Sequence, residues 1–321
     1  MSLAPIVLFV YNRPEHTRRT LQALSRNVLA KESVLHIYAD GAKENASEDQ
    51  CHRIEEVRRL ISSELWCGEV IIHESDHNNG LYQSVRRGVT ELVDQYGKVI
   101  VMEDDLQTSP AFLSYMNRAL EFYADRKSVF SVSGYNYPTT CMPLPTDYMY
   151  DTYVCLRNAS WGWGTWADRW KQIDWEVNAY TTIKHTPAIK EALNRMGDDE
   201  FDILYQRMEK GLNIWSIQFT IAHFVNHAVA IYPVQSYVHN TGNDGSGENC
   251  SATHALDNAT LSTNMEPKFI DILYEDRRII NAFYSVNCRT RRPLWQRGCN
   301  WIARKMDKPI PFVIKRPILT M

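Results

Sequence analysis

The sequence predicts an α/β protein built around a mostly parallel, Rossmann-like sheet. Short apolar runs recur along the first half of the chain, as expected of strands that are buried on both faces. They cover residues 5–10, 34–39, 70–72, 99–102 and 128–132. Segments with apolar residues at helical spacing separate these runs. The resulting alternation favours parallel strands joined by crossover helices that cover both faces of the sheet.

Each helix expected between these strands has its own signature. After Pro14, residues of one helical face recur as far as Val28, and a polar helix is expected over about residues 47–63. The turn signal Asn78-Asn79-Gly80 precedes a third helix. The pair Ser109-Pro110 offers an N-cap followed by a proline at the first helical position, so we expect a fourth helix to begin there.

The second half of the chain is less regular. Loops and short strands are expected over residues 135–160, and a short aromatic helix is expected after the run Trp161-Gly162-Trp163-Gly164. Residues 187–210 and 214–227 have helical patterns, and an apolar strand over 228–232 ends at Pro233. We therefore expect a mixed α/β second half beside the regular first half.

Composition restricts the function classes. The chain has 321 residues, of which 44% are hydrophobic and 23% charged, which excludes a wholly disordered, collagenous or coiled-coil protein. The formal net charge of −3 provides no field that would attract nucleic acid. No run of 18 apolar residues occurs, so no membrane-spanning helix is expected. Seven cysteines without a CxxC pair argue against a disulfide framework or a zinc ribbon and favour a cytoplasmic protein.

The C-terminal segment differs in charge from the rest of the chain. Residues 287–321 hold nine Lys or Arg and one acidic residue, with apolar side chains at helical spacing. A basic amphipathic segment of this kind can lie on an anionic membrane surface. A C-terminal helix docked on the protein's own acidic body would have the same pattern. We therefore separate residues 286–321 as a basic tail and leave both interpretations open.

Polar clusters follow three of the predicted strands. They are Tyr11-Asn12-Arg13, Asp40-Gly41 and Glu103-Asp104-Asp105. Ligands of open parallel sheets bind beyond the carboxyl ends of the strands, so these clusters are expected to share one crevice. Adjacent carboxylates repel one another unless a cation neutralises them. The acidic triplet therefore predicts a Mg²⁺ or Mn²⁺ site shared with a diphosphate, against the alternative of a solvated acidic turn.

Other motifs admit both a functional and a structural interpretation. Asp40 can accept hydrogen bonds from a nucleobase or a ribose, or belong to a plain turn. Asn79 and Gly80 can bring backbone close to a ribose or phosphate, or simply start a helix. The run Trp161 to Gly164 can stack on a sugar or form a packed aromatic corner. The sequence contains no GxxxxGK[ST], GxGxxG or GxSxG motif, which argues against P-loop, dinucleotide and hydrolase sites.

Six segments together resemble a known family. They are PIVLFVYNRPEH, ADG, NNGLYQSVRRGV, VIVMEDDLQTSPAFLSYMNRAL, SVSGYNYP and SWGWGTWADRW. The chain resembles bacterial, family-2-like glycosyltransferases of the GT-A fold over about residues 4–250. It is more distantly similar to N-acetylglucosaminyltransferase I, whose DxD motif is also Glu-Asp-Asp. The tail after about residue 285 lies outside the resemblance.

The resemblance implies a division of the chain and a set of site residues. Residues 1–135 would form the nucleotide-sugar-binding half and 136–285 the acceptor-side half of one GT-A unit. The donor would be a nucleotide-sugar, with a UDP-sugar favoured, and Mn²⁺ or Mg²⁺ would bind its diphosphate. The implied donor-binding residues are Val10, Asn12, Arg13, Asp40, Asn79, Gly80, Asp104, Trp161 and Gly162, with Asp105 and Asp104 at the metal. Residues 240–247 would form a lid over the donor.

The family also implies an inverting hexosyl or N-acetylhexosaminyl transfer to a glycan or glycolipid, in bacterial polysaccharide biosynthesis. A carboxylate would take the acceptor's proton. The stretch where relatives carry that acid reads Leu212-Asn213-Ile214-Trp215 here, and asparagine cannot serve as a base. The remaining candidates are Asp199, Asp202 and Asp244, with Asp198 and Glu200 nearby.

Two alternatives to a glycosyltransferase are considered. A non-catalytic nucleotide-sugar or glycan-binding relative is compatible with Asn213. A sugar-nucleotide pyrophosphorylase would need a glycine-rich basic loop after the first strand, which Tyr11-Asn12-Arg13-Pro14 does not supply.

Overall fold

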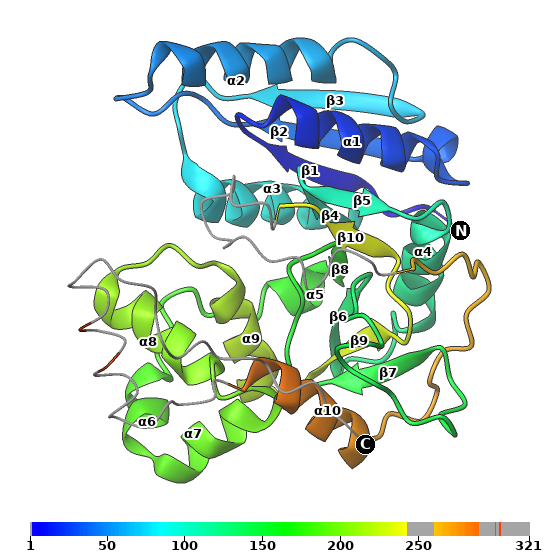
Figure 1. Cartoon of the computed structure of the whole chain (residues 1–321), viewed down its shortest axis with the longest axis vertical. Coiled ribbons are helices and arrows are strands. Elements are labelled where there is room, and N and C mark those ends of the chain that lie inside the picture. Colours follow the sequence, from blue (N-terminus) through cyan, green and yellow to red (C-terminus); the bar gives the residue numbers. More distant parts are fainter. Residues whose placement is uncertain (1, 243–259, 289–298, 300–301, 303–321) are drawn as a thin grey trace.

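The computed structural model of the protein describes residues 2–242 and 260–288, together with Cys299 and Ile302. An eight-stranded sheet in the order β3-β2-β1-β4-β8-β6-β9-β7 forms its centre (Figure 1). A small two-stranded sheet pairs β10 with β5. The prediction of an α/β protein with a mostly parallel sheet is confirmed.

The first half alternates strands and helices as predicted. Its elements are β1 (Ile6–Val10), α1 (Pro14–Ser25), β2 (Val34–Ala39), α2 (Glu48–Ile61), β3 (Glu69–Glu74), α3 (Gly80–Tyr96), β4 (Lys98–Glu103), β5 (Leu106–Thr108), α4 (Phe112–Phe122) and β6 (Val129–Ser133), with a short 3₁₀ turn at Ala30–Glu32. Every side chain of β1 is buried, because β1 lies between β2 and β4 and has helices on both faces. The continuous apolar run is thus the signature of a central parallel strand.

The second half carries shorter elements. They are β7 (Thr152–Cys155), β8 (Trp163–Trp166), α5 (Ala167–Trp170), α6 (Tyr180–His185), α7 (Pro187–Leu193), a 3₁₀ turn (Asn194–Met196), α8 (Glu200–Lys210), α9 (Ser216–Val225), β9 (Val229–Pro233), β10 (Val238–Asn240) and α10 (Arg277–Asn287). None of the helices in the described ranges combines the length and the apolar character needed to cross a bilayer.

Strand direction brings the important strand ends to one edge of the sheet. β1 pairs in parallel with β2 and β4, and β6 pairs in parallel with β9. β8 runs antiparallel between β4 and β6, so its first residue, Trp163, pairs with Val101 and Ser133 near their carboxyl ends. The start of β8 therefore belongs to the same edge as the ends of β1, β2 and β4.

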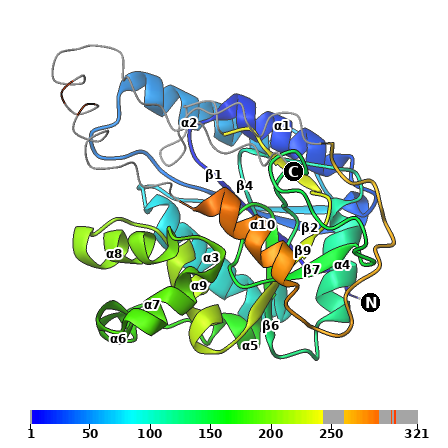
Figure 2. The same cartoon turned by 60° about the horizontal axis from the view of Figure 1, so that its bottom comes forward.

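Helices cover both faces of the sheet. The helices α1, α2 and α4 share one core cluster with Ile6, Leu8 and Val10 of β1. The helices α3, α5 and α9 share another with Val7 and Phe9. Alternate residues of one strand thus point into two cores, and Figure 2 shows α1 and α2 on the opposite side of the sheet from α3 and α9.

The structure corrects several predicted boundaries. The first helix ends at Ser25 rather than near Val28, because the Val28 amide donates to the Pro110 carbonyl and the Val28 side chain is exposed. The fourth helix begins at Phe112 rather than at Ser109-Pro110. Ser109 lies in the preceding turn, and its buried hydroxyl has no hydrogen-bond partner and caps nothing.

Two further predictions were wrong in the second half. The helix expected over 187–210 is interrupted, because Gly197 has φ 154°, a conformation that α-helices do not contain. Trp163 to Trp166 form strand β8, which was not predicted, and the expected short aromatic helix begins only after it, as α5. The elements β5, β10 and α10 were not predicted from the sequence.

Two buried histidines make stability depend on pH. Burial lowers the pKa of His36 to about 4, with the neighbouring His73 adding to the effect, and burial lowers that of His223 to about 4. Unfolding restores ordinary values, so the unfolded chain binds more protons between about pH 6.5 and 4. Stability is therefore expected to fall as the pH drops through this window.

We expect the free energy of unfolding to decrease by about 2–4 kcal/mol between pH 7.5 and 5 because of these two groups. Urea denaturation at both pH values measures it. The variant His36→Phe should show a flatter pH dependence than the natural protein. An unchanged dependence in this variant would show that His36 is not buried in its neutral form.

Candidate functional site

The structure brings two of the predicted polar clusters into direct contact. Arg13 follows β1 immediately before α1, and Asp104 and Asp105 follow the neighbouring strand β4. The Arg13 Nη2 donates to Asp104 Oδ1 and, at 3.0 Å, to Asp105 Oδ2, and Arg13 Nε lies 3.3 Å from Asp104 Oδ2. Both aspartates are 5% exposed. A half-buried guanidinium with two buried carboxylates therefore lies at the carboxyl edge of the sheet.

Backbone contacts fix both sides of this cluster. The carbonyl of Arg13 accepts the amide and the hydroxyl of Thr17, in the first turn of α1. The hydroxyl of Thr20 donates to the carbonyl of Asp104 at 2.8 Å. On the other side, the amide of Thr241 donates to the carbonyl of Asp105 at 2.8 Å. The helix α1 and the segment after β10 thus hold the charged side chains between them.

Gly242 closes the cluster from the side of β10. A Cβ atom at this position would overlap Asp105 Oδ2 and lie 3.2 Å from Arg13 Nη1. The backbone of the chain therefore packs directly against the ion pair, and only glycine leaves room for it.

Burial and neighbouring charges shift the pKa values of the acidic residues at this site. Burial raises the pKa of Asp104 to about 6 and that of Glu103 to about 8, and the charge of Asp105 acts in the same direction on both. Arg13 opposes both shifts. Although burial works to lower it, the pKa of Arg13 itself is raised by Asp104 and Asp105, so the guanidinium stays charged. The site thus concentrates negative charge that a single arginine only partly compensates.

One carboxylate oxygen remains available for a cation. Asp105 Oδ1 is buried and has no hydrogen-bond partner, which is costly for a charged oxygen unless something binds it. Within the described ranges, no three His, Cys, Asp or Glu side chains form a cluster that could hold a metal. Mg²⁺ is typically held by only one or two carboxylates together with phosphate oxygens and water. The residues present fit a divalent ion of this shared kind.

Asp40 organises the next strand end. Its backbone amide donates to the carbonyl of Val10, which places the two strand ends side by side. Its carboxylate accepts the amides of Asn79 and Gly80 at 2.8 and 2.9 Å, and that of Gly41 at 3.0 Å. A negative charge is thereby held at the N-terminus of α3, where the helix dipole favours it.

A cavity of about 270 Å³ lies beside Asp40. Its lining comes from the ends of β2 and β3 and from the first turns of α3, and includes Asn79, Ser84 and Arg87. The rings of Tyr38 and His73, which also line it, stack at 4.3 Å. Val10 is buried at the end of β1, and Asn12 is half-buried beyond it.

Of the aromatic run Trp161 to Gly164, only the first part is accessible at the carboxyl edge of the sheet. Trp163 is fully buried in the core against Trp170, Trp215 and Phe219, so its face is unavailable to a ligand. Trp161 is half-buried and contacts the ring of Tyr135 at 4.6 Å. Gly162 has φ 63°, and its carbonyl accepts the amide of Gly134.

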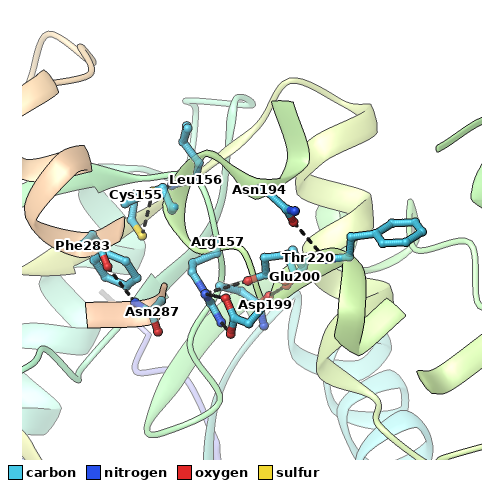
Figure 3. Close-up of polar contacts among 12 residues, drawn as sticks. Cys155, Leu156, Arg157, Asn194, Asp199, Glu200, Thr220, Phe283 and Asn287 are labelled. Atoms are coloured by element: carbon cyan, nitrogen blue, oxygen red, sulfur yellow. Dashed lines mark hydrogen bonds and ion pairs between the residues drawn. The ribbon is translucent and has the colours of Figure 1, made fainter. Parts of the chain in front are cut away.

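Asp199, the first predicted base, belongs to a buried ion-pair cluster (Figure 3). Arg157 donates to both carboxylate oxygens of Asp199, at 3.0 and 3.3 Å, and its Nε lies 2.7 Å from Glu200 Oε1. Burial raises the pKa of Glu200 although Arg157 opposes the shift. Asp202 lies half-buried in the first turn of α8. The carboxylate of Asp199 is therefore already neutralised by a guanidinium.

Some predicted residues lie outside the described ranges. Asp244 and residues 243–247 of the predicted lid are among them, as is most of the basic tail. Conversely, the sequence predicted Gly242 as part of the lid but not its contact with Asp105, and it did not predict the pairing of Arg13 with the two aspartates. The only sequence signal for Gly242 is its place in a segment rich in glycine, asparagine and serine.

Comparisons with known proteins give distant structural likenesses. No protein-family model and no curated protein matches the chain. Residues 1–349 of TarS from S. aureus share 13% identity, with a TM-score of 0.39 over 75% of this chain and 61% of that one. A longer TarS structure shares 12% identity, with a TM-score of 0.41 over 75% of this chain and 37% of that one. The mannosyltransferase PcManGT from Pyrobaculum calidifontis, in complex with GDP-Man and Mn²⁺, shares 11% identity, with a TM-score of 0.38 over 70% of this chain and 74% of that one. The chain thus spans less than two thirds of either TarS structure.

Proposed function

We propose that the protein is a metal-dependent, inverting glycosyltransferase that moves a sugar from a nucleotide-sugar donor to a glycan or glycolipid acceptor. The observation that carries this proposal is the cluster of Arg13, Asp104 and Asp105 at the carboxyl edge of the sheet, with one buried carboxylate oxygen left free. The sequence segments that form this edge are those that resemble GT-A glycosyltransferases.

In this proposal, Asp105 and Asp104 hold Mn²⁺ or Mg²⁺ together with the donor's diphosphate. The bound ion would stabilise the negative charge that develops on the leaving nucleoside diphosphate. The free Oδ1 of Asp105 supports the assignment of this residue as the main ligand. Gly242 packs so closely against the other oxygen of the same carboxylate that a Cβ atom would overlap it.

The nucleoside is proposed to bind beside Asp40. Val10, Asn12 and Arg13 approach it from β1, and Asn79 and Gly80 approach it from the start of α3. The cavity of about 270 Å³ next to Asp40 supports this place for the donor. We keep the UDP-sugar as the favoured donor and hexosyl or N-acetylhexosaminyl transfer as the reaction.

On the acceptor side, Trp161 and Gly162 are proposed to border the sugar. The general base takes the acceptor's proton as its oxygen attacks the anomeric carbon, and the diphosphate leaves from the opposite face. Because Arg157 neutralises Asp199, we favour Asp202 or Asp244 for this role. Polysaccharide biosynthesis in the cytoplasm of a bacterium, with residues 287–321 touching an anionic membrane, completes the proposal.

The alternative function is a non-catalytic nucleotide-sugar or glycan-binding relative. The exposed Asn213, where an acid is expected, and the ion-paired Asp199 favour it. Binding of a nucleotide-sugar without turnover on any acceptor would identify this alternative.

A thermal-shift screen tests the proposal. UDP-, GDP- and dTDP-sugars are added with Mn²⁺ or with EDTA, because a ligand that binds only the folded state raises the melting temperature. We expect at least one nucleotide-sugar to stabilise the protein in Mn²⁺ and much less in EDTA. No stabilisation by any of them would contradict the proposal.

The variant Gly242→Ala probes the site without removing a charged group. The added Cβ would displace the Asp105 carboxylate, so the affinity for a nucleotide-sugar with Mn²⁺ should fall by about 10–100-fold, as when a ligand's support is removed. Calorimetry measures it. The control Gly97→Ala places the same change at φ 78° after α3, with nothing nearby. It should cost stability and leave the affinity unchanged; equal affinities in both variants would disprove the role of Gly242.

A further inference from the structure

We infer that Arg13 is a built-in counter-ion that keeps the divalent metal from binding to Asp105 until a nucleoside diphosphate is present. Metal and nucleotide would then bind as a coupled pair rather than independently. This inference rests on the proposed function and deepens it, because it concerns the regulation of the same site.

The first argument is occupancy of the carboxylates. Of the four carboxylate oxygens of Asp104 and Asp105, three have Arg13 nitrogens as partners. Only Asp105 Oδ1 is without one. A divalent ion that arrives alone therefore finds a single free oxygen in this pair of carboxylates, and the other oxygen of the same carboxylate is already paired with a guanidinium.

The second argument is that Arg13 cannot easily leave. Its side chain is only 19% exposed, and its backbone carbonyl is fixed by Thr17. Gly242 packs against Nη1. A guanidinium is not deprotonated in proteins, and its planar fork matches two carboxylate oxygens at once. The positive charge at this place is therefore permanent.

The third argument is charge balance. One guanidinium beside two carboxylates leaves a single net negative charge in a poorly hydrated place. A divalent ion alone would turn this into an uncompensated positive charge, and a diphosphate alone would add to the negative one. Uncompensated charge is expensive where water is excluded. Metal and diphosphate together largely compensate one another, so each is expected to strengthen the binding of the other.

The experiment measures Mn²⁺ binding by the electron paramagnetic resonance signal of the free ion, which does not require turnover. The full chain is titrated with Mn²⁺ alone and in the presence of UDP or GDP. The variants are Arg13→Gln, which removes the charge, and Arg13→Lys, which keeps it. The control Arg18→Gln removes a charge from an exposed position of the same helix.

We expect Arg13→Gln to bind Mn²⁺ alone at least about tenfold more tightly than the natural protein, because a like charge next to the metal position is gone. Arg13→Lys and Arg18→Gln should stay close to the natural protein. In the natural protein, a nucleoside diphosphate should strengthen Mn²⁺ binding, and in Arg13→Gln this effect should be much smaller.

Two results overturn the inference in distinguishable ways. If the natural protein binds Mn²⁺ with a nucleotide but Arg13→Gln binds Mn²⁺ alone no more tightly, the counter-ion role is wrong and the proposed function stands. If neither protein binds Mn²⁺ under any of these conditions, the proposed metal site is wrong, and the inference fails with it.

Discussion

Replacing Asp105 by asparagine is expected to abolish most of the sugar transfer. The substitution keeps the shape of the side chain but removes the charge of the carboxylate that has a free buried oxygen at this edge of the sheet. A metal that stabilises a leaving group contributes several kcal/mol to the barrier, so the rate should fall by about 10²–10³-fold. Release of nucleoside diphosphate from the donor, with and without acceptor, measures the loss.

The matched control for this prediction is Asp125→Asn. Asp125 is an exposed acid after α4, away from the carboxyl edge of the sheet. This variant should retain full activity. Turnover in Asp105→Asn close to that of the control would disprove the metal role of Asp105.

The largest expected effect on stability comes from Arg157. This guanidinium is largely buried between Asp199 and Glu200, and its ion pairs connect the loop after β7 to the start of α8. Replacing it by leucine leaves the buried Glu200 and the partly buried Asp199 without a counter-ion. Breaking a buried ion pair in this way costs about 3–5 kcal/mol. Urea denaturation at pH 7.5 measures the loss.

The exposed pair of Lys127 and Asp168 provides the comparison. Exposed ion pairs contribute only about 0–1 kcal/mol, so Lys127→Met should change the unfolding free energy little. Equal losses in Arg157→Leu and Lys127→Met would show that the Arg157 cluster is not a buried ion-pair network.

Asp199→Asn separates structure from catalysis at the same cluster. If Asp199 only compensates Arg157, the variant should lose stability while the surviving folded protein turns over at nearly the natural rate. A loss of turnover in fully folded Asp199→Asn would instead restore Asp199 as the catalytic base.

The sequence predicts the sheet well because its central strands are buried on both faces. The apolar run of β1 has no polar residue that could face solvent, so it predicts a strand buried on both faces. Arg13, Asp40 and Asp105 follow the ends of such runs. Side chains at these points meet at one edge because parallel strands end together. The location of the candidate site therefore follows from local pattern.

What the sequence does not predict depends on contacts between distant segments. The sequence predicted Arg13 near the nucleoside but not its pairing with residues 91 and 92 positions further along the chain. The role of Gly242 depends on the pairing of β10 with β5. Trp163 lies only two residues after Trp161 in the same aromatic run, and it is the pairing of β8 with β4 and β6 that makes it a core residue. Local periodicity carries no information on any of these contacts.

The place proposed for a divalent ion can be tested directly. Crystals grown with Mn²⁺ and a nucleoside diphosphate should show an anomalous difference peak in direct coordination with the Asp105 carboxylate and the diphosphate, with the nucleoside beside Asp40. A manganese peak bound to other side chains, or a nucleotide bound away from this edge of the sheet, would contradict the account.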